Sequence, residues 1–241
     1  MSFEVYQAIC KIQLTSGTTE SIFTHCFLVL EWNLMARADN ICFTHINHIT
    51  WDDDSLVFYF MMSKGDQEGV NSKEPWHVYS NPTNPYICPI LALTRYVFCN
   101  PSVLNDSYKL FESRDPYQRY SKTLSRSLEA NVSIFEAMGV GIDNIGSYSG
   151  RKGSATRCST GCTVSRPMAS ICLRAGWSMG PVRERYIHYE KAGDQFVGRT
   201  VGGLNSMSTD FGVSPCYFDF PGTMQEENRQ SAQVNIDKML K

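Results

Sequence analysis

Arginine, tryptophan and tyrosine are the residue types whose order along this chain suits chemistry on a phosphodiester. Arg37 and Arg151 lie far apart in the sequence, and Trp177 precedes Tyr186 by nine residues. An arginine fork binds a phosphate through two hydrogen bonds, and a tyrosine hydroxyl can become a covalent nucleophile. Together these side chains could cut a phosphodiester without a metal ion or another cofactor.

Each of these residues has a definite role in such a reaction. Attack on the phosphorus places negative charge on the non-bridging oxygens, which Arg37 and Arg151 would stabilise. Trp177 would donate its indole N–H to one of the same oxygens. Tyr186 would be the nucleophile, with Tyr189, one helical turn later, as the alternative. Taken singly, either arginine could be a surface or core-paired residue, and Trp177 could be a core tryptophan.

A proton donor and a further phosphate contact complete the set. Lys64 follows a strand-like segment and falls near a hairpin tip, where it could protonate the departing oxygen. The alternative is an ordinary solvent-exposed lysine in a turn. Tyr148 lies three residues before Arg151 and can hydrogen-bond a phosphate oxygen. With an ordinary pKa of about 10, this phenol is a poor proton acceptor at neutral pH.

Three local motifs accompany the ordered set: Trp32–Asp39, Cys88–Leu93 and Arg174–Ser178. With the residues above, they resemble the tyrosine recombinase (phage integrase) family, and they look most like the recombinases of Crypton-type mobile elements. The resemblance runs from about Arg37 to Tyr186. It implies a site-specific DNA recombinase or integrase that cuts and rejoins double-stranded DNA through a 3′-phosphotyrosyl link. It also implies no metal or cofactor, a tetramer formed on DNA through the C-terminal tail, and a nuclear location.

The catalytic set that the resemblance implies is Arg37, Lys64, Tyr148, Arg151, Trp177 and Tyr186. One position departs from the family, because Tyr148 stands where the family usually has histidine. The family also carries a helical DNA-clamping domain, for which the roughly 36 residues before Arg37 are too few. The alternative is a catalytically silent DNA-binding or scaffold protein derived from a mobile-element recombinase. A third reading is a relaxing enzyme similar to type IB topoisomerases.

The charge is unevenly distributed along the chain. The formal net charge is −2, but eight basic and two acidic residues give the segment 151–191 a charge of +6 and leave −8 for the remainder. Such a basic stripe is typical of a phosphate-facing surface, although a solvated helical face is the plainer interpretation. The candidate DNA-binding residues in this segment are Lys152, Arg157, Arg183 and Arg185.

Other function classes find less support in the sequence. Gly139, Gly141 and Gly146 do not form a dinucleotide-binding motif. His45 and His48, with Cys42 nearby, could bind a metal, but no matching second pair of ligands follows. Nine cysteines without framework spacing favour a reducing intracellular compartment. No apolar segment is long enough to predict a membrane span.

The expected fold is α+β, mainly helical, with a small three-stranded antiparallel sheet similar to that of tyrosine recombinases. A catalytic domain would cover 1–200, and 201–241 would form an extended tail with a short helix over Gln225–Leu240. The predicted strands are Ile46–Trp51, Leu56–Met62 and Pro75–Tyr79. The predicted helices are Phe3–Leu14, Glu20–Met35, Pro89–Phe98, Gln118–Met138, Arg151–Thr160, Arg166–Ala175 and Pro181–Gln195.

Overall fold

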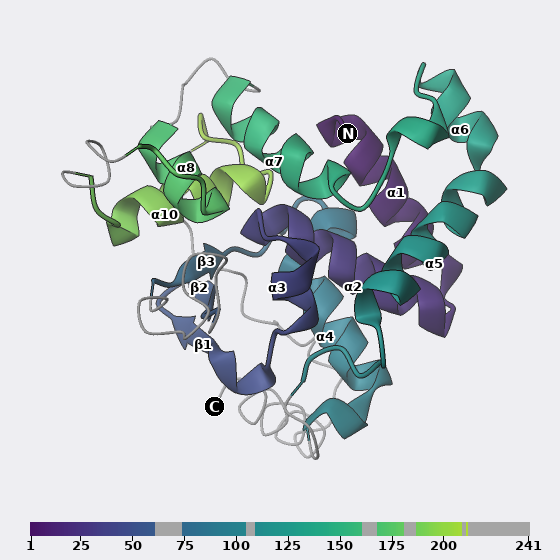
Figure 1. The fold of residues 1–241 in the computed structure, drawn as a ribbon, viewed down its shortest axis with the longest axis horizontal. Coiled ribbons are helices and arrows are strands. Elements are labelled where there is room, and N and C mark those ends of the chain that lie inside the picture. The colour runs from purple at the N-terminus through teal and green to yellow at the C-terminus, as the bar shows by residue number, and fades with distance from the viewer. Residues whose placement is uncertain (61–73, 105–108, 161–167, 181–186, 209–210, 212–241) are drawn as a thin grey trace, which may run out of the picture.

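The computed structural model describes residues 1–60, 74–104, 109–160, 168–180, 187–208 and 211. It is mainly helical with one small antiparallel sheet, which confirms the predicted α+β class (Figure 1). The longer helices are α1 (Phe3–Ser16), α2 (Thr19–Leu34), α4 (Pro89–Cys99), α5 (Pro116–Ala130), α7 (Ser149–Thr160) and α10 (Lys191–Val201). The shorter ones are α3 (Ala38–Cys42), α6 (Val132–Ala137) and α8 (Met168–Ala175), with 3₁₀ turns at Ile46–His48, Pro85–Ile87, Pro101–Leu104 and Ile142–Asn144.

Helix α2 is the centre of the fold. Every residue from Ser21 to Leu34 is buried, as expected for a helix that is apolar all round. It contacts α1, α4, α5 and α7, so most of the core forms around it. Trp32 stacks on Tyr6 of α1 with ring centroids 4.0 Å apart, and its indole N–H donates to the carbonyl of Val201 at 3.2 Å. These contacts tie the first helix and the end of α10 to the same helix.

The sheet has the strand order β1 (Ile49–Asp52), β2 (Ser55–Phe58) and β3 (Trp76–Val78), all antiparallel. β1 and β2 form a tight hairpin in which Asp52 pairs with Ser55 and Asp53 takes a left-handed φ of 53°. β3 contacts α10, so the sheet lies on the same side of α2 as α8 and α10 in Figure 1, while α5 and α6 lie on the other side.

Several predicted boundaries are wrong. The helix predicted over Gln118–Met138 is two helices, since the backbone of Asn131 leaves the helical region and its side-chain amide donates to the carbonyl of Ser127. The predicted strand Ile46–Trp51 begins as a 3₁₀ turn, and β1 starts at Ile49. The helix predicted over Pro181–Gln195 is absent at 187–190, and α10 begins at Lys191.

The sequence predicted a reducing environment for the cysteines and no membrane-spanning segment. The seven cysteines within the described ranges are all free thiols. Among the helices that the structure describes, none is both long and apolar enough to cross a bilayer.

Candidate functional site

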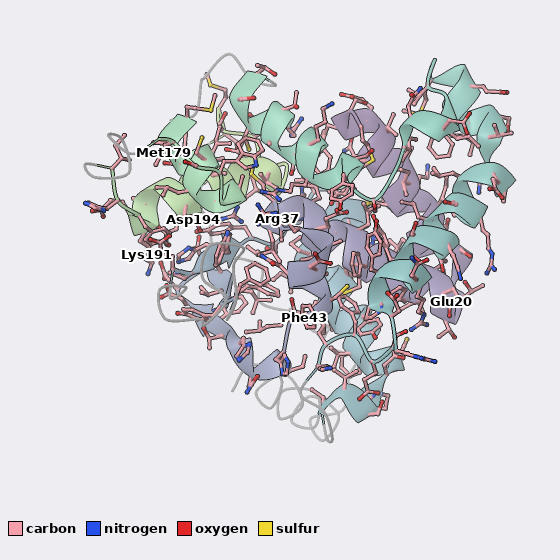
Figure 2. The ribbon with its side chains drawn as sticks, in the orientation of Figure 1. Glu20, Arg37, Phe43, Met179, Lys191 and Asp194 are labelled. Carbon is pink, nitrogen blue, oxygen red and sulfur yellow. The ribbon has the colours of Figure 1, made fainter. Side chains whose placement is uncertain are left out.

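Arg37 is placed by a sharp turn at the end of α2. Met35 ends that helix in a left-handed conformation with φ 49°, and its N–H donates to the carbonyl of Trp32. The chain then extends through Arg37, which is the N-cap residue of α3. Its neighbours Ala36 and Ala38 are both buried, so the arginine leaves an apolar stretch of backbone and is itself half-buried. Figure 2 shows Arg37 near the middle of the view, where the α2–α3 turn faces α7.

Arg151 is placed by the close approach of α7 to α2. A Cβ atom at Gly150 would lie 2.7 Å from Oε2 of Glu31, and one at Gly153 would lie 2.7 Å from the Trp32 ring. Both glycines therefore bring the first turns of α7 against α2 at a spacing that alanine could not reach. Arg151 lies between these glycines in the first turn of the same helix and is half-buried.

Trp177 is placed by the turn that ends α8. Gly176 has φ +60°, its N–H donates to the carbonyl of Leu173 at 3.0 Å, and the N–H of Trp177 donates to the carbonyl of Cys172 at 2.9 Å. This pair of bonds is a Schellman motif, which requires a left-handed residue and so favours glycine at 176. Trp177, which follows, is 43% exposed, so part of this residue is open to solvent or a ligand.

The end of α8 also contacts Arg151. One terminal nitrogen of Arg151 donates to the carbonyl of Ala175, one of the last carbonyls of α8. The guanidinium carbon lies 5.9 Å from the centroid of the Trp177 ring. Arg151 thus joins α7 to the end of α8, and among the residues that the structure describes its buried Nε has no hydrogen-bond partner.

The two arginines are close enough to interact electrostatically. Burial lowers the pKa of Arg151, and the positive charge of Arg37 lowers it further. Within the described residues, no carboxylate lies at ion-pair distance from either guanidinium. The nearest acid that acts on Arg151 is Glu31, and burial raises the pKa of Glu31 to about 8. At neutral pH the arginine pair therefore carries two positive charges beside a carboxyl group that is mostly protonated.

The remaining candidate residues of α7 have different surroundings. Tyr148 precedes the helix and is 70% exposed, so its hydroxyl is accessible. Lys152 is also exposed. Arg157 lies over the ring of Phe3, with its guanidinium carbon 3.4 Å from the ring centroid, and thereby packs on α1. Lys152 is the more accessible of the two basic side chains.

Four candidates lie outside the described residues: Lys64, Arg183, Arg185 and Tyr186. Tyr189 is described, and its hydroxyl donates to the carbonyl of Pro75 at 2.9 Å. Burial raises the pKa of Tyr189 well above its usual range. This phenol is therefore held as a hydrogen-bond donor to the segment before β3. It lines a pocket between α8, 187–190 and the first turn of α10, and neither Arg37 nor Arg151 is part of that lining.

Arg174 belongs to a buried network that the sequence did not reveal. Its Nη1 pairs with the carboxylate of Asp194, and its Nη2 donates to the carbonyls of Asn33 and His77 at 2.8 Å each. The backbone N–H and Nδ1 of His77 both lie 2.8 Å from the same carboxylate. Arg174 is only 3% exposed, so it does not belong to a phosphate-facing surface. It instead fixes α8, three residues before Trp177, against α2, β3 and α10.

Asp194 keeps a negative charge in this network. Burial alone would raise its pKa, but the charge of Arg174 and the hydrogen bonds from His77 outweigh burial and leave the pKa below its ordinary value. No spacing rule joins residues 33, 77, 174 and 194, which is why a sequence pattern could not find them. A second charge of the basic segment, Lys191, pairs with Asp52 of β1.

The two histidines that the sequence analysis considered and set aside as metal ligands, His45 and His48, do lie together, with their ring centroids 5.2 Å apart. Over the part of the chain that the structure describes, no group of three histidine, cysteine or acidic side chains is arranged to hold a metal ion.

No protein-family model matches this sequence, and no curated protein matches it either.

Proposed function

We propose that the chain binds double-stranded DNA through a backbone phosphate held by Arg37, Arg151 and Trp177, and that it has the fold and strand-transfer activity of a tyrosine recombinase. The observation that carries this proposal is the convergence of two arginines, 114 positions apart in sequence, beside an acid that is neutral at pH 7. Two like charges that lie close together repel each other unless an anion lies between them or solvent screens them. A phosphodiester is an anion that matches two guanidinium forks and an indole donor.

The chemistry that follows involves one bond exchange at phosphorus. The Tyr186 hydroxyl oxygen forms a bond to the phosphorus, and the bond from phosphorus to the 5′ oxygen breaks. The phenolic proton passes to a base or to solvent, and Lys64 supplies the proton that the leaving 5′ oxygen takes up. The ester energy is kept in the phosphotyrosyl link, so that rejoining requires no cofactor. Arg37 and Arg151 stabilise the charge that develops on the non-bridging oxygens.

The burial of Tyr189 and the hydrogen bond of its hydroxyl support the choice of Tyr186 over Tyr189 as the nucleophile. A nucleophilic phenol must lose its proton, and burial makes this harder for Tyr189 by raising its pKa. Its hydroxyl is also occupied by the hydrogen bond to Pro75. We therefore assign the nucleophile to Tyr186, with a tetramer assembled on DNA through the C-terminal tail.

A second candidate is a DNA-binding protein without strand-transfer activity. Tyr148 itself favours it, because it stands where the family that the chain resembles usually has histidine, and a phenol is a poorer proton acceptor than an imidazole. DNA binding through the arginine pair would remain in that case.

A suicide substrate separates these two functions. A nicked duplex that releases a short fragment after cleavage traps any protein–DNA adduct, which is then counted on a denaturing gel. We expect an adduct with the wild type and with Tyr189→Phe, and none with Tyr186→Phe. Arg-dependent DNA binding without an adduct from any of the three proteins would support the silent DNA-binding protein instead.

The binding step has its own test. Because each phosphate contact releases counterions, Arg37→Gln should reduce the slope of log affinity against log salt concentration by about 1. Lys122→Gln removes an exposed lysine of α5 as the matched control and should leave the slope closer to that of the wild type. Equal slopes for Arg37→Gln and the wild type would refute a phosphate contact at this site.

A further inference from the structure

Glu31 is an acidic side chain enclosed between α2, α5 and α7. It is 1% exposed, and the hydroxyl of Tyr120 donates to its Oε2 at 3.1 Å. The same oxygen would lie 2.7 Å from a Cβ atom at Gly150, the residue immediately before Arg151. The carboxyl group is therefore adjacent to the helix that carries one half of the arginine pair.

The charge state of Glu31 matters because an ionised carboxylate would compete with an external phosphate for the single positive charge of Arg151. Burial raises the pKa of Glu31 to about 8, although the Tyr120 hydrogen bond and the charge of Arg151 both act to lower it. Below that pH the carboxyl is neutral and both guanidinium groups keep their full charge for an external anion. Above it, the carboxylate attracts Arg151 and cancels part of the positive potential.

We propose that Glu31 is a positioning residue for Arg151, which leaves both arginines to a DNA phosphate while it is uncharged and draws Arg151 away from that phosphate when it ionises. This inference rests on the proposed DNA-binding function. It adds a proton-controlled element to the site, since phosphate binding and Glu31 ionisation then oppose each other. By linkage, a bound phosphate must raise the pKa of Glu31, and alkaline pH must weaken phosphate binding.

Few other groups near Glu31 change charge between pH 6.5 and 9.5. On α5, burial raises the pKa of Tyr120 well above its usual range, and on α3 burial raises that of Cys42 to about 12. On α1, burial also raises the pKa of Tyr6 and of Cys10. The α-amino group of Met1 has a pKa that is lowered by burial and by the charge of Lys152. A variant at Glu31 separates its contribution from that of Met1.

The experiment measures the dissociation constant of a short fluorescent duplex by anisotropy, from pH 6.5 to 9.5 at constant ionic strength. For the wild type we expect affinity to fall as pH rises through about 8, by about tenfold for each unit by which bound phosphate raises the pKa of Glu31. Glu31→Gln keeps the shape and the Tyr120 hydrogen bond but cannot ionise, so its affinity should fall much less. Glu129→Gln, an exposed acid of α5, should follow the wild type.

A second variant tests the direction of the effect without changing Glu31. Tyr120→Phe removes a hydrogen bond that stabilises the ionised carboxyl, so the midpoint of the affinity loss should move to higher pH. A Glu31→Gln protein with the full wild-type loss, or a Tyr120→Phe midpoint at lower pH, would overturn the inference while the DNA-binding function stands. Wild-type binding that Arg37→Gln does not weaken would overturn both.

Discussion

Replacing Glu31 by glutamine should stabilise the protein at alkaline pH and change little at acidic pH. The folded-state pKa of Glu31 is raised, so the folded protein holds a proton that the unfolded chain releases. The stability linked to this proton is fully present below the unfolded pKa of 4.5 and is lost as pH rises through about 8. Glutamine has no proton to lose, so the variant should not show this part of the loss.

The size of the effect follows from the two pKa values. The folded-state value is about 8 and the ordinary value is 4.5. At about 1.4 kcal/mol per pKa unit, the difference corresponds to an upper limit of about 5 kcal/mol lost between pH 4.5 and 9. An effect of this size is a large part of the stability of an ordinary domain. The side chain is 1% exposed, so solvent screening removes little of it.

The assay is urea unfolding followed by tryptophan fluorescence at pH 5, 7 and 9, with Glu129→Gln as the exposed control. We expect the wild type to lose more stability than Glu31→Gln between pH 5 and 9, with the two proteins nearest in stability at pH 5. Parallel loss in both proteins would mean that Glu31 titrates like an ordinary surface acid. That result would refute the argument from burial.

Two further changes test how the site is held together. Gly153→Ala places a methyl group against the backbone oxygen of Met1 and 2.7 Å from the Trp32 ring and should cost about 1–3 kcal/mol in urea unfolding, whereas Gly146→Ala, with open space around it, should change stability by less than about 0.5 kcal/mol. Asp194→Asn leaves Arg174 buried without its counter-charge and should cost about 3–5 kcal/mol, while Asp143→Asn on the surface should cost little. Because the pKa of Asp194 is depressed, its contribution is present above the unfolded pKa and is lost as pH falls through the lower folded value. Equal stabilities within either pair of variants would contradict the packing or the charge argument behind it.

Local signals in the sequence were sufficient for the elements that local chemistry decides. Thr18 caps α2 by accepting from the N–H of Ser21 at 3.1 Å, and its side-chain hydroxyl before an apolar run is a local signal for the start of a helix. The helix starting at Pro89 follows from proline at the first turn. The predicted helix over Pro181–Gln195 was wrong at 187–190, because two long-range contacts hold the chain there. These are the hydrogen bond from Tyr189 to Pro75 and the ion pair from Lys191 to Asp52.

For the candidate site too, the sequence identifies residues but not their surroundings. Arg37, Arg151 and Trp177 were selected by residue type and order, and the structure places Arg151 close enough to Arg37 to feel its charge and 5.9 Å from the Trp177 ring. What sequence order cannot give is the environment of each charge. Arg174 and Arg151 both belong to the basic segment 151–191, and the sequence does not distinguish them. In the structure, Asp194 neutralises Arg174, whereas Arg151 has no carboxylate at ion-pair distance among the described residues. This difference arises because α8 packs against α10, which places Asp194 beside Arg174.

For Glu31, however, the sequence does contain a signal that its carboxyl group has an unusual environment. It is the one acidic residue in the apolar run Ile22–Met35, and a charged residue inside such a run is either paired or neutral. With Tyr120 as its hydrogen-bond donor and Gly150 leaving room for it, the carboxyl is accommodated in the neutral form. An apolar residue at 31 would give the arginine pair the same charge at every pH, and a surface acid would neutralise it at every pH above 5. A buried acid beside Arg151 is the arrangement that makes the positive potential of the pair depend on pH within the physiological range.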